Sequence, residues 1–303
     1  LQTSSVSRVL EGTVSGVQAS ASSGQPGTDA EIRIRGIGSI NASSAPLYVV
    51  DGVPFDGSVN SINPDDIASM TVLASAALYG SRGANGVIII TTKQGQQDSK
   101  ATVKVKATLG GSSRAVRDYD RVNTNQYFEL YWEALRNQYA KSSDYTPATA
   151  ATQASKDLVT KLMGGGPNPY GTQYPQPVGT DGKLAAGARP LWNSDWSDAM
   201  EQQALRTELN LSVSGGGKAN QYFFSAGYLN DKGIALESGY QRFNLRSNVT
   251  SEMTSWLKGS INLSFAHSMQ NYPVSSDSKT SNVITAGRTM PGFYPIYEMN
   301  TDG

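Results

Sequence analysis

The sequence predicts an antiparallel β-barrel that follows a small α+β unit, and three observations support this fold class. Residues from 101 onward contain segments in which apolar and polar side chains alternate strictly. Residues 1–97 instead contain short β-branched runs separated by glycine and serine. Aromatic residues fall near the ends of the alternating segments, as the interfacial girdles of a membrane barrel require. We therefore expect two parts, at 1–97 and 98–303.

The first part contains four short runs that predict strands, namely EIRIRG, PLYVVDG, MTVL and NGVIIITTK. In the second run, the apolar residues Leu47–Val50 are followed at once by Asp51-Gly52 and Pro54. An uninterrupted apolar run of four residues bounded by turn residues predicts a strand that is covered on both faces. The strand should therefore end in a tight turn at Asp51-Gly52.

Asn63-Pro64-Asp65-Asp66 predicts the start of a helix. Asparagine suits the N-cap, proline suits the first helical position, and acids suit the first turn. A paired-carboxylate catalytic or metal site is the alternative, but no histidine or further acid lies nearby in the sequence. Capping is the simpler interpretation. A second short helix is expected at Ser75–Tyr79, ending near Gly80.

The alternation after residue 101 gives each segment one apolar and one polar face. The apolar positions are Val103, Val105, Ala107, Leu109, Leu209, Leu211, Val213, Tyr222, Phe224, Ala226, Tyr228, Phe243, Leu245, Leu257, Ile261, Leu263 and Phe265. Turns are expected at NDKG (230–233) and SGGGKAN (214–220). A soluble sandwich would show the same alternation. A transmembrane barrel is favoured because these aromatic residues fall near strand ends: Tyr222, Tyr228, Tyr240, Trp256 and Tyr272.

An insert at about 118–200 interrupts the alternating segments. Helical spacing of apolar residues predicts one helix at Asn123–Lys141 and a second at Ala148–Gly166. The Pro/Tyr-rich loop Pro167–Pro177 suits contacts with sugars or peptides, or simply a rigid surface segment. The rigid surface segment is the favoured interpretation.

Composition excludes several functions. The 25 basic and 25 acidic residues balance, so the net charge gives no argument for nucleic acid. The chain lacks cysteine, which removes disulfides and thiolate chemistry. The single histidine, His267, lies in an alternating segment without an acid at useful spacing, and GSRGANG (80–86) leads into a strand and lacks the P-loop lysine. We therefore expect no enzyme activity, no metal and no cofactor.

The chain looks like a piece of a longer protein. It opens at Leu1 without an initiator methionine and stops at NTDG. No window approaches the roughly 18 consecutive apolar residues that a transmembrane helix needs. About five strands are visible, whereas a barrel closed around an internal domain has about 22. If the alternating segments form such a barrel, most of it lies outside this chain.

Residues 9–95 resemble the plug domain of TonB-dependent outer-membrane transporters, and more narrowly that of the SusC/RagA family. The resemblance rests on the ordered motifs IRIRG, YVVDGVP, NPDDI and ALYGSRGANGVIIITTK. It continues in WNSDWSDAM (192–200), LNLSVSGGGKANQYFFSAGYLNDKGI (209–234) and RFNLRSNV (242–249), which are similar to the early barrel strands of that family.

The resemblance implies a plug lodged inside a transmembrane barrel of the outer membrane. It also implies active import of a large nutrient, an oligosaccharide or oligopeptide, together with a SusD-like surface lipoprotein. TonB would pull a segment that lies N-terminal to this chain. Outer-membrane lipid would surround the barrel, and a dimer of transporter–lipoprotein pairs is compatible with the family. A siderophore or cobalamin receptor and a barrel-anchored adhesin are the alternatives.

Two sets of plug residues follow from position in the family. The loops after IRIRG and DGVP are expected to contact cargo through Ser39, Asn41, Ser43, Ser44, Phe55, Asp56 and Asn60, although ordinary turn chemistry is the favoured explanation of any single one of them. Asp51 and Gly52 are expected to shape the plug. Arg33, Arg35 and Arg82 are expected to hold the plug to the barrel wall through carboxylates.

Overall fold

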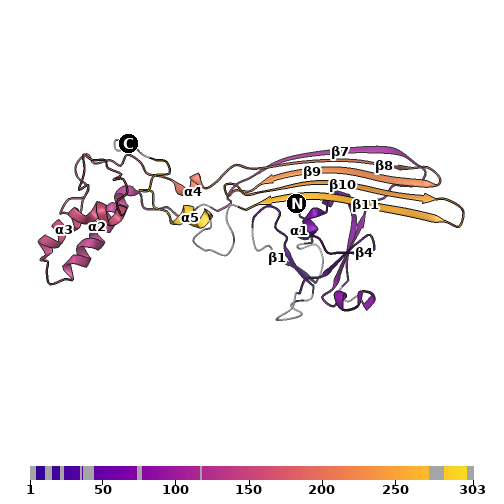
Figure 1. Cartoon of the computed structure of the whole chain (residues 1–303), viewed down its shortest axis with the longest axis horizontal. Coiled ribbons are helices and arrows are strands. Elements are labelled where there is room, and N and C mark those ends of the chain that lie inside the picture. The colour runs from indigo at the N-terminus through magenta and orange to yellow at the C-terminus, as the bar shows by residue number, and fades with distance from the viewer. Residues whose placement is uncertain are drawn as a thin grey trace. The chain divides into compact units, whose positions relative to one another are not determined.

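The computed structural model describes residues 5–10, 16–20, 24–34, 36, 44–73, 77–116, 118–272 and 283–298. The chain divides into two compact units (Figure 1). The first comprises Leu1–Ser113 and Gln203–Pro273, and the second comprises Arg114–Gln202 and Val274–Gly303. The first unit contains a small domain, here called the plug (residues 5–97), and five long strands, here called the wall.

The plug is built around a four-stranded sheet in the order β4-β3-β6-β5. Its strands are β3 (Leu47–Val50), β4 (Val53–Phe55), β5 (Ile67–Leu73) and β6 (Val87–Thr92). A separate pair, β1 (Val17–Ser20) and β2 (Glu31–Ile34), and the short helix α1 (Val6–Val9) complete it. Ile88 and Ile90 of β6 are fully buried in a core that also contains Val6, Leu10, Ile32 and Ile62.

Both faces of β3 contact apolar clusters, as its uninterrupted apolar run predicts. Leu47 and Val49 are buried with Val87, while Tyr48 and Val50 are half-buried against the larger core. The strand ends in a two-residue hairpin, because Val50 pairs with Val53 across Asp51-Gly52. Both turn residues have positive φ, 49° and 87°. This conformation is the type I′ turn that Asp-Gly favours, and Pro54 is tolerated because β4 is an edge strand.

The predicted helical segments of the plug are 3₁₀ turns rather than α-helices. Asn63 does act as an N-cap, since its side chain accepts a hydrogen bond from Asp65 N, but the element is the single 3₁₀ turn η2 (Pro64–Asp66). The second segment is η3 (Ala77–Gly83) rather than a helix ending near Gly80. Gly80 has a φ of 58° inside it and kinks the chain. A third 3₁₀ turn, η1 (Val59–Ser61), precedes η2, and Ser75 lies outside the described residues.

The wall is an antiparallel meander in the order β11-β10-β9-β8-β7, and its strands run side by side in Figure 1. Their bounds are β7 (Ser99–Ser112), β8 (Ala204–Gly216), β9 (Asn220–Lys232), β10 (Gly239–Glu252) and β11 (Lys258–Asn271). The strands are longer than the sequence pattern indicates. Residues 230–232 were expected in a turn but continue β9. The turn expected at 214–220 is shorter, since only residues 217–219 connect β8 to β9.

The wall is patterned in the opposite sense to a soluble protein, because its polar face is buried and its apolar face is exposed. Arg242, Asn244 and Asn248 of β10 are buried, whereas Phe243 and Leu245 of the same strand are more than 40% exposed. A soluble sandwich buries its apolar faces. The arrangement is that of a membrane barrel, in which apolar side chains face lipid and polar ones face the interior.

The expected aromatic girdle is only partly present. Tyr228, Trp256 and Tyr272 are exposed, and Tyr222 is half-buried. Tyr240 was wrongly assigned, because it is buried on the polar face and its hydroxyl donates to Asn60 O. His267 is exposed on β11, opposite Phe243, which places it on the apolar face of the wall.

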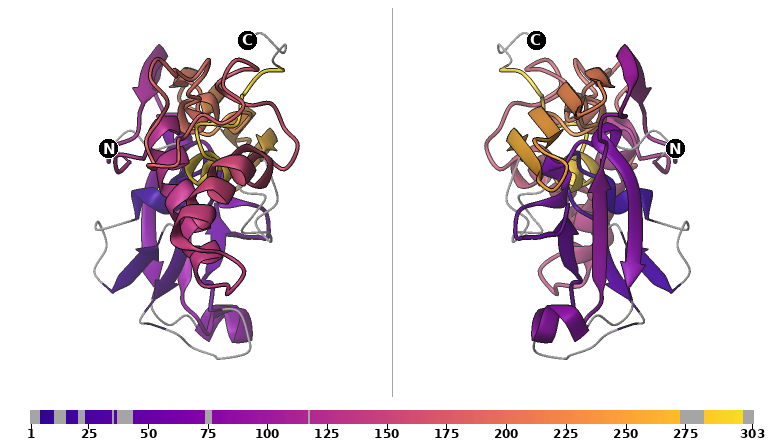
Figure 2. Two further views of the ribbon diagram at one scale, coloured as in Figure 1. Left: turned by 90° about the vertical axis from the view of Figure 1, so that its left-hand side faces the viewer. Right: turned by 90° about the vertical axis from the view of Figure 1, so that its right-hand side faces the viewer.

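The second unit is mainly helical. α2 (Thr124–Ala140) and α3 (Pro147–Met163) each begin with a capping box, at Asn123 and Thr146, and they pack against each other (Figure 2). Their core includes Phe128, Trp132, Leu158 and Tyr170. The short helices α4 (Trp196–Ala199) and α5 (Val283–Thr289) lie together in the same unit. Among the described residues, no helix combines the length and apolarity that crossing a membrane would need.

Candidate functional site

The candidate site is the contact between the plug and the polar face of the wall. It is formed by side-chain hydrogen bonds and ion pairs between residues far apart in sequence, so the wall supplies donors and the plug supplies many of the acceptors. These contacts fall into three groups. They are centred on the turn at Asp51, on the turn at Asn63–Asp66, and on the backbone near Asn60.

The first group surrounds Asp51, the first residue of the β3–β4 turn. Its carboxylate accepts hydrogen bonds from Thr92 N at 2.8 Å and Thr92 Oγ1 at 2.7 Å, which link the turn to β6. Arg246 Nη1 of the wall lies 3.4 Å from Asp51 Oδ2. Asn248 Nδ2 donates to Thr92 Oγ1 at 2.9 Å and to Lys93 O at 2.8 Å. All four side chains are buried or half-buried, so water does not compete freely for these bonds.

The second group surrounds the turn Asn63–Asp66. Asn210 lies at its centre, accepting from Asn63 Nδ2 at 2.8 Å and donating to Asp65 Oδ2 at 2.5 Å. Lys106 Nζ contacts both oxygens of Asp65, at 2.8 and 3.0 Å. Asp66 is buried, with Asn244 Nδ2 at 3.5 Å and Arg246 Nε at 3.7 Å from its Oδ2. Burial raises the pKa of Asp66, and the charge of Arg246 opposes that shift.

The third group holds the backbone of η1 and of the residue that follows it. Arg242 Nη1 donates to Asn60 O at 2.8 Å and to Ile62 O at 3.1 Å, and Tyr240 also donates to Asn60 O. The Asn60 side chain itself donates to Gly27 O at 2.7 Å. Arg242 is a fully buried side chain, which is costly unless its donors are used. This group therefore anchors the plug backbone to β10.

The expected cargo residues are dispersed. Ser39, Asn41 and Ser43 lie outside the described residues, and Ser44 is half-buried. Phe55 packs partly against the plug core, and Asp56 is exposed. Asn60 is buried and engaged in the anchoring contacts above, so its position favours a structural role over contact with cargo.

The partners of two plug arginines in the described residues lie within the plug. Arg33 pairs with Glu31 on its own strand, and Arg82 pairs with Asp56, so both ion pairs lie within the plug. Arg35 lies outside the described residues. Arginines do join plug and wall, but Arg242 and Arg246 come from the wall, and Arg246 meets the plug carboxylates. Sequence reasoning missed them, although they stand at polar positions of the alternating segment RFNLRSNV.

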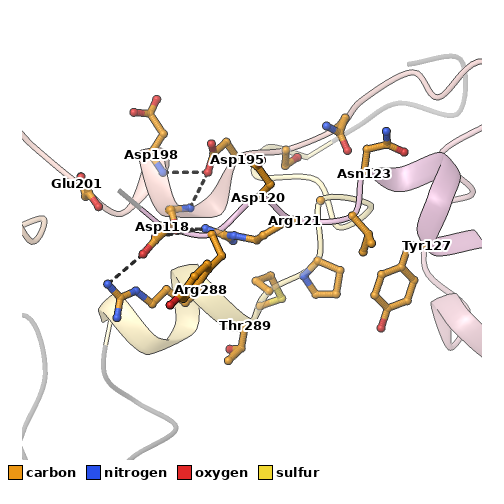
Figure 3. A pocket seen from close by; sticks show the side chains of 18 of the residues that line it. Asp118, Asp120, Arg121, Asn123, Tyr127, Asp195, Asp198, Glu201, Arg288 and Thr289 are labelled. Atoms are coloured by element: carbon orange, nitrogen blue, oxygen red, sulfur yellow. Dashed lines mark hydrogen bonds and ion pairs between the residues drawn. The ribbon is translucent and has the colours of Figure 1, made fainter. Parts of the chain in front are cut away.

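The second unit contains a separate cavity of about 730 Å3 (Figure 3). It is lined by residues 114, 118–123, 127, 193–195, 197, 198, 201 and 288–292. Asp118 lies between arginines on one side of it, with Arg288 at 3.0 Å and Arg121 at 3.7 Å. Arg114 also contacts Asp118 and Glu201. Burial alone would raise the pKa of Asp118, but the bonds and charges of Arg114 and Arg288 hold that pKa below its usual range. These ion pairs tie three segments of the unit together.

Comparison with known proteins identifies the domain family of the plug. Residues 1–87 match the family model of the TonB-dependent receptor plug domain. TonB-dependent receptor P39 of Formosa agariphila is 33% identical over 86% of this chain and 22% of its own length. TonB-dependent receptor SusC of Bacteroides thetaiotaomicron is 31% identical over 89% of this chain and 23% of its own length. The chain thus spans less than a quarter of these relatives.

The fold agrees with solved structures. The RagAB peptide importer in its closed-closed state aligns with 96% of this chain and 32% of its own, with a TM-score of 0.71 and 27% identity. A ferric enterobactin receptor of Pseudomonas aeruginosa aligns with a TM-score of 0.50 at 13% identity, which shows a shared fold alone. Together with the inverted wall and the plug motifs, these likenesses place the chain: it belongs to the SusC/RagA family of TonB-dependent receptors and comprises the plug domain and the first barrel strands.

Proposed function

We propose that the protein to which this chain belongs imports a large nutrient across the outer membrane of a Gram-negative bacterium, driven by TonB. The observation that carries this proposal is the polar plug–wall contact described above. An apolar outer face suits lipid, and a polar inner face that binds a separate small domain suits a pore closed by a removable plug. No nucleophile, general base or metal is required for that task.

The cargo is proposed to be an oligopeptide or an oligosaccharide. RagAB, which aligns with nearly the whole chain, is a peptide importer. This likeness favours an oligopeptide, whereas the relatives named as receptors give no cargo in their names. Peptides bind through backbone hydrogen bonds as well as side-chain pockets, while sugars favour stacked aromatic side chains.

The partners follow from the same proposal. TonB would supply force through a segment N-terminal to the plug, and a SusD-like surface lipoprotein would deliver cargo from outside the cell. Outer-membrane lipid would contact the exposed apolar row of the wall. A dimer of transporter–lipoprotein pairs would bring two such importers together.

Purification of the tagged full-length protein from outer membranes tests the proposal. Mass spectrometry should identify one co-purifying surface lipoprotein and a bound set of oligopeptides or oligosaccharides, which also decides between the two cargo classes. A bound iron chelate or cobalamin without a lipoprotein would establish the receptor alternative. Recovery of neither cargo nor lipoprotein, from cells with normal protein levels, would favour a barrel-anchored adhesin.

A further inference from the structure

One transverse row of wall residues holds the plug turn Asn63–Asp66. Lys106 pairs with Asn210, Asn210 with Gly227, and Gly227 with Asn244 in the registers of neighbouring strands. Register partners of antiparallel strands direct their side chains to the same face of a sheet. The four residues therefore form a continuous band across β7, β8, β9 and β10 on the side that faces the plug.

The two consecutive acids of the turn reach opposite ends of this row. Asp65 contacts Lys106 of β7 and Asn210 of β8, whereas the Asp66 carboxylate lies 3.5 Å from Asn244 Nδ2 of β10. Asn63 bonds to Asn210 between them. The turn thus straddles β9 and binds the strands on both sides of it.

Gly227 makes this close approach possible. A Cβ atom at this position would lie 2.6 Å from Asn244 Oδ1, 2.7 Å from Asn210 Oδ1 and 2.8 Å from Asn63 Nδ2. Any side chain here would occupy the space in which these three amides now meet. The glycine therefore provides a seat for the turn at the centre of the row.

The contact is composed of polar groups that water can solvate. Asn63, Asp65, Asp66, Lys106, Asn210 and Asn244 contribute amides, carboxylates and an ammonium group. Separating them exposes hydrogen-bonding groups to water, whereas the apolar core around Ile88 and Ile90 lies within the plug itself. Opening this contact therefore exposes these polar side chains to water, and the plug core can remain folded.

We propose that the turn Asn63–Asp66 and the row Lys106–Asn210–Gly227–Asn244 form a reversible clasp, which closes the resting importer and opens in every transport cycle. This inference rests on the proposed import function. It predicts that a covalent link across the clasp stops transport while leaving the protein folded and inserted.

This chain lacks cysteine, and a direct test combines Asn63→Cys with Gly227→Cys in a form of the full-length protein in which any cysteine outside this chain is replaced by serine. Uptake of radiolabelled oligopeptide or oligosaccharide by whole cells is measured before oxidation, after oxidation, and after reduction. We expect oxidation to abolish the uptake that the reduced double variant supports, and reduction to restore that level. The parent protein and each single variant serve as controls, and their uptake should not respond to oxidant.

The outcomes separate the clasp from the import function. Unchanged uptake by fully cross-linked protein, with normal uptake by the parent, would overturn the clasp and leave the import function intact. Absence of energy-dependent uptake by the parent would overturn both. Should the variant at 227 fail to reach the outer membrane, Asn63→Cys with Asn210→Cys, bridged by a short bifunctional thiol reagent, replaces it and is judged by the same results.

Discussion

Arg246 of the wall lies 3.4 Å from Asp51 of the plug, and its Nε lies 3.7 Å from Asp66. One buried guanidinium therefore faces two plug carboxylates that belong to different turns. Because these side chains are almost inaccessible to solvent, neither charge can be compensated by water if its partner is removed. Through these two contacts, Arg246 links the end of β3 to the start of β5.

Removal of this guanidinium should loosen the plug. We expect Arg246→Met to destabilise the plug by about 3–5 kcal/mol, because breaking a buried ion pair leaves carboxylates without compensation. Limited proteolysis of the full-length protein should then cut within the plug. The matched control is Arg33→Met, which breaks the exposed pair with Glu31 and should cost about 0–1 kcal/mol. Equal protection of the two variants would contradict the role assigned to Arg246.

The hairpin turn gives a prediction about backbone conformation. Gly52 has a φ of 87°, and a Cβ there would meet no atom within 4 Å, so any penalty is conformational rather than steric. Gly52→Val should cost about 1–2 kcal/mol and lower outer-membrane levels, whereas Gly52→Asn should be milder because asparagine tolerates the left-handed region. Quantitative blotting of membrane fractions measures both. Normal abundance and uptake of the valine variant would exclude this explanation of the turn.

The helical unit depends on Trp132, which is buried between α2 and α3 and donates to Ser155 Oγ at 2.8 Å. Trp132→Ala should destabilise the unit by about 3–5 kcal/mol, because it leaves a large cavity. Trp132→Phe keeps most of the packing and should cost about 1 kcal/mol for the lost hydrogen bond. Protease cleavage between 124 and 163 in the full-length protein reports the difference. If both variants are cut equally, the packing contribution has been misjudged.

The pair Tyr139 and Asp157 gives a prediction about pH. The Tyr139 hydroxyl donates to Asp157 Oδ2 at 2.6 Å, and this bond lowers the pKa of Asp157 and raises the pKa of Tyr139 to about 12. A lowered carboxyl pKa contributes stability that is present above the unfolded value of about 3.9 and is lost as pH falls through the folded value. A raised phenol pKa contributes stability that is lost as pH rises from about 10 towards the folded value.

Tyr139→Phe should therefore be less stable than the parent at pH 7, and the difference should shrink in acid. Protease protection of the helical unit, followed from pH 7 to pH 3, measures this change. A difference between the two proteins that stays constant over that range would show that the bond does not carry the pH dependence.

The sequence predicts which face of each wall strand is polar, because the period of two assigns faces directly. Partners are not predictable in this way, since Asn63 and Asn210 are 147 residues apart and only the folded chain brings them together. Tyr240 illustrates the same limit. Its position near a strand end suggested a membrane interface, yet it shares the even-numbered face with Arg242 and Asn244, and that face is buried. The alternation of faces along β10 is therefore a better guide to the position of Tyr240 than its aromatic side chain near a strand end.

The turn Asn63–Asp66 contacts the wall more extensively than its sequence predicts. Helix capping explains why asparagine and proline stand where they do, and the structure contains that cap. Capping does not explain why two acids follow, and both turn out to contact the wall. Similarly, Arg33 and Arg82 required acidic partners, but charge alone does not distinguish a partner in the plug from one in the wall.

Uptake of cargo by cells that retain or lack TonB tests the proposed import function. Labelled oligopeptides and oligosaccharides are offered to cells expressing the full-length protein, and accumulation in the periplasm is measured in both backgrounds. We expect accumulation of one of these cargo classes only when TonB is present, at equal levels of the protein in the outer membrane. Accumulation that is independent of TonB, or absent in both backgrounds, would contradict it.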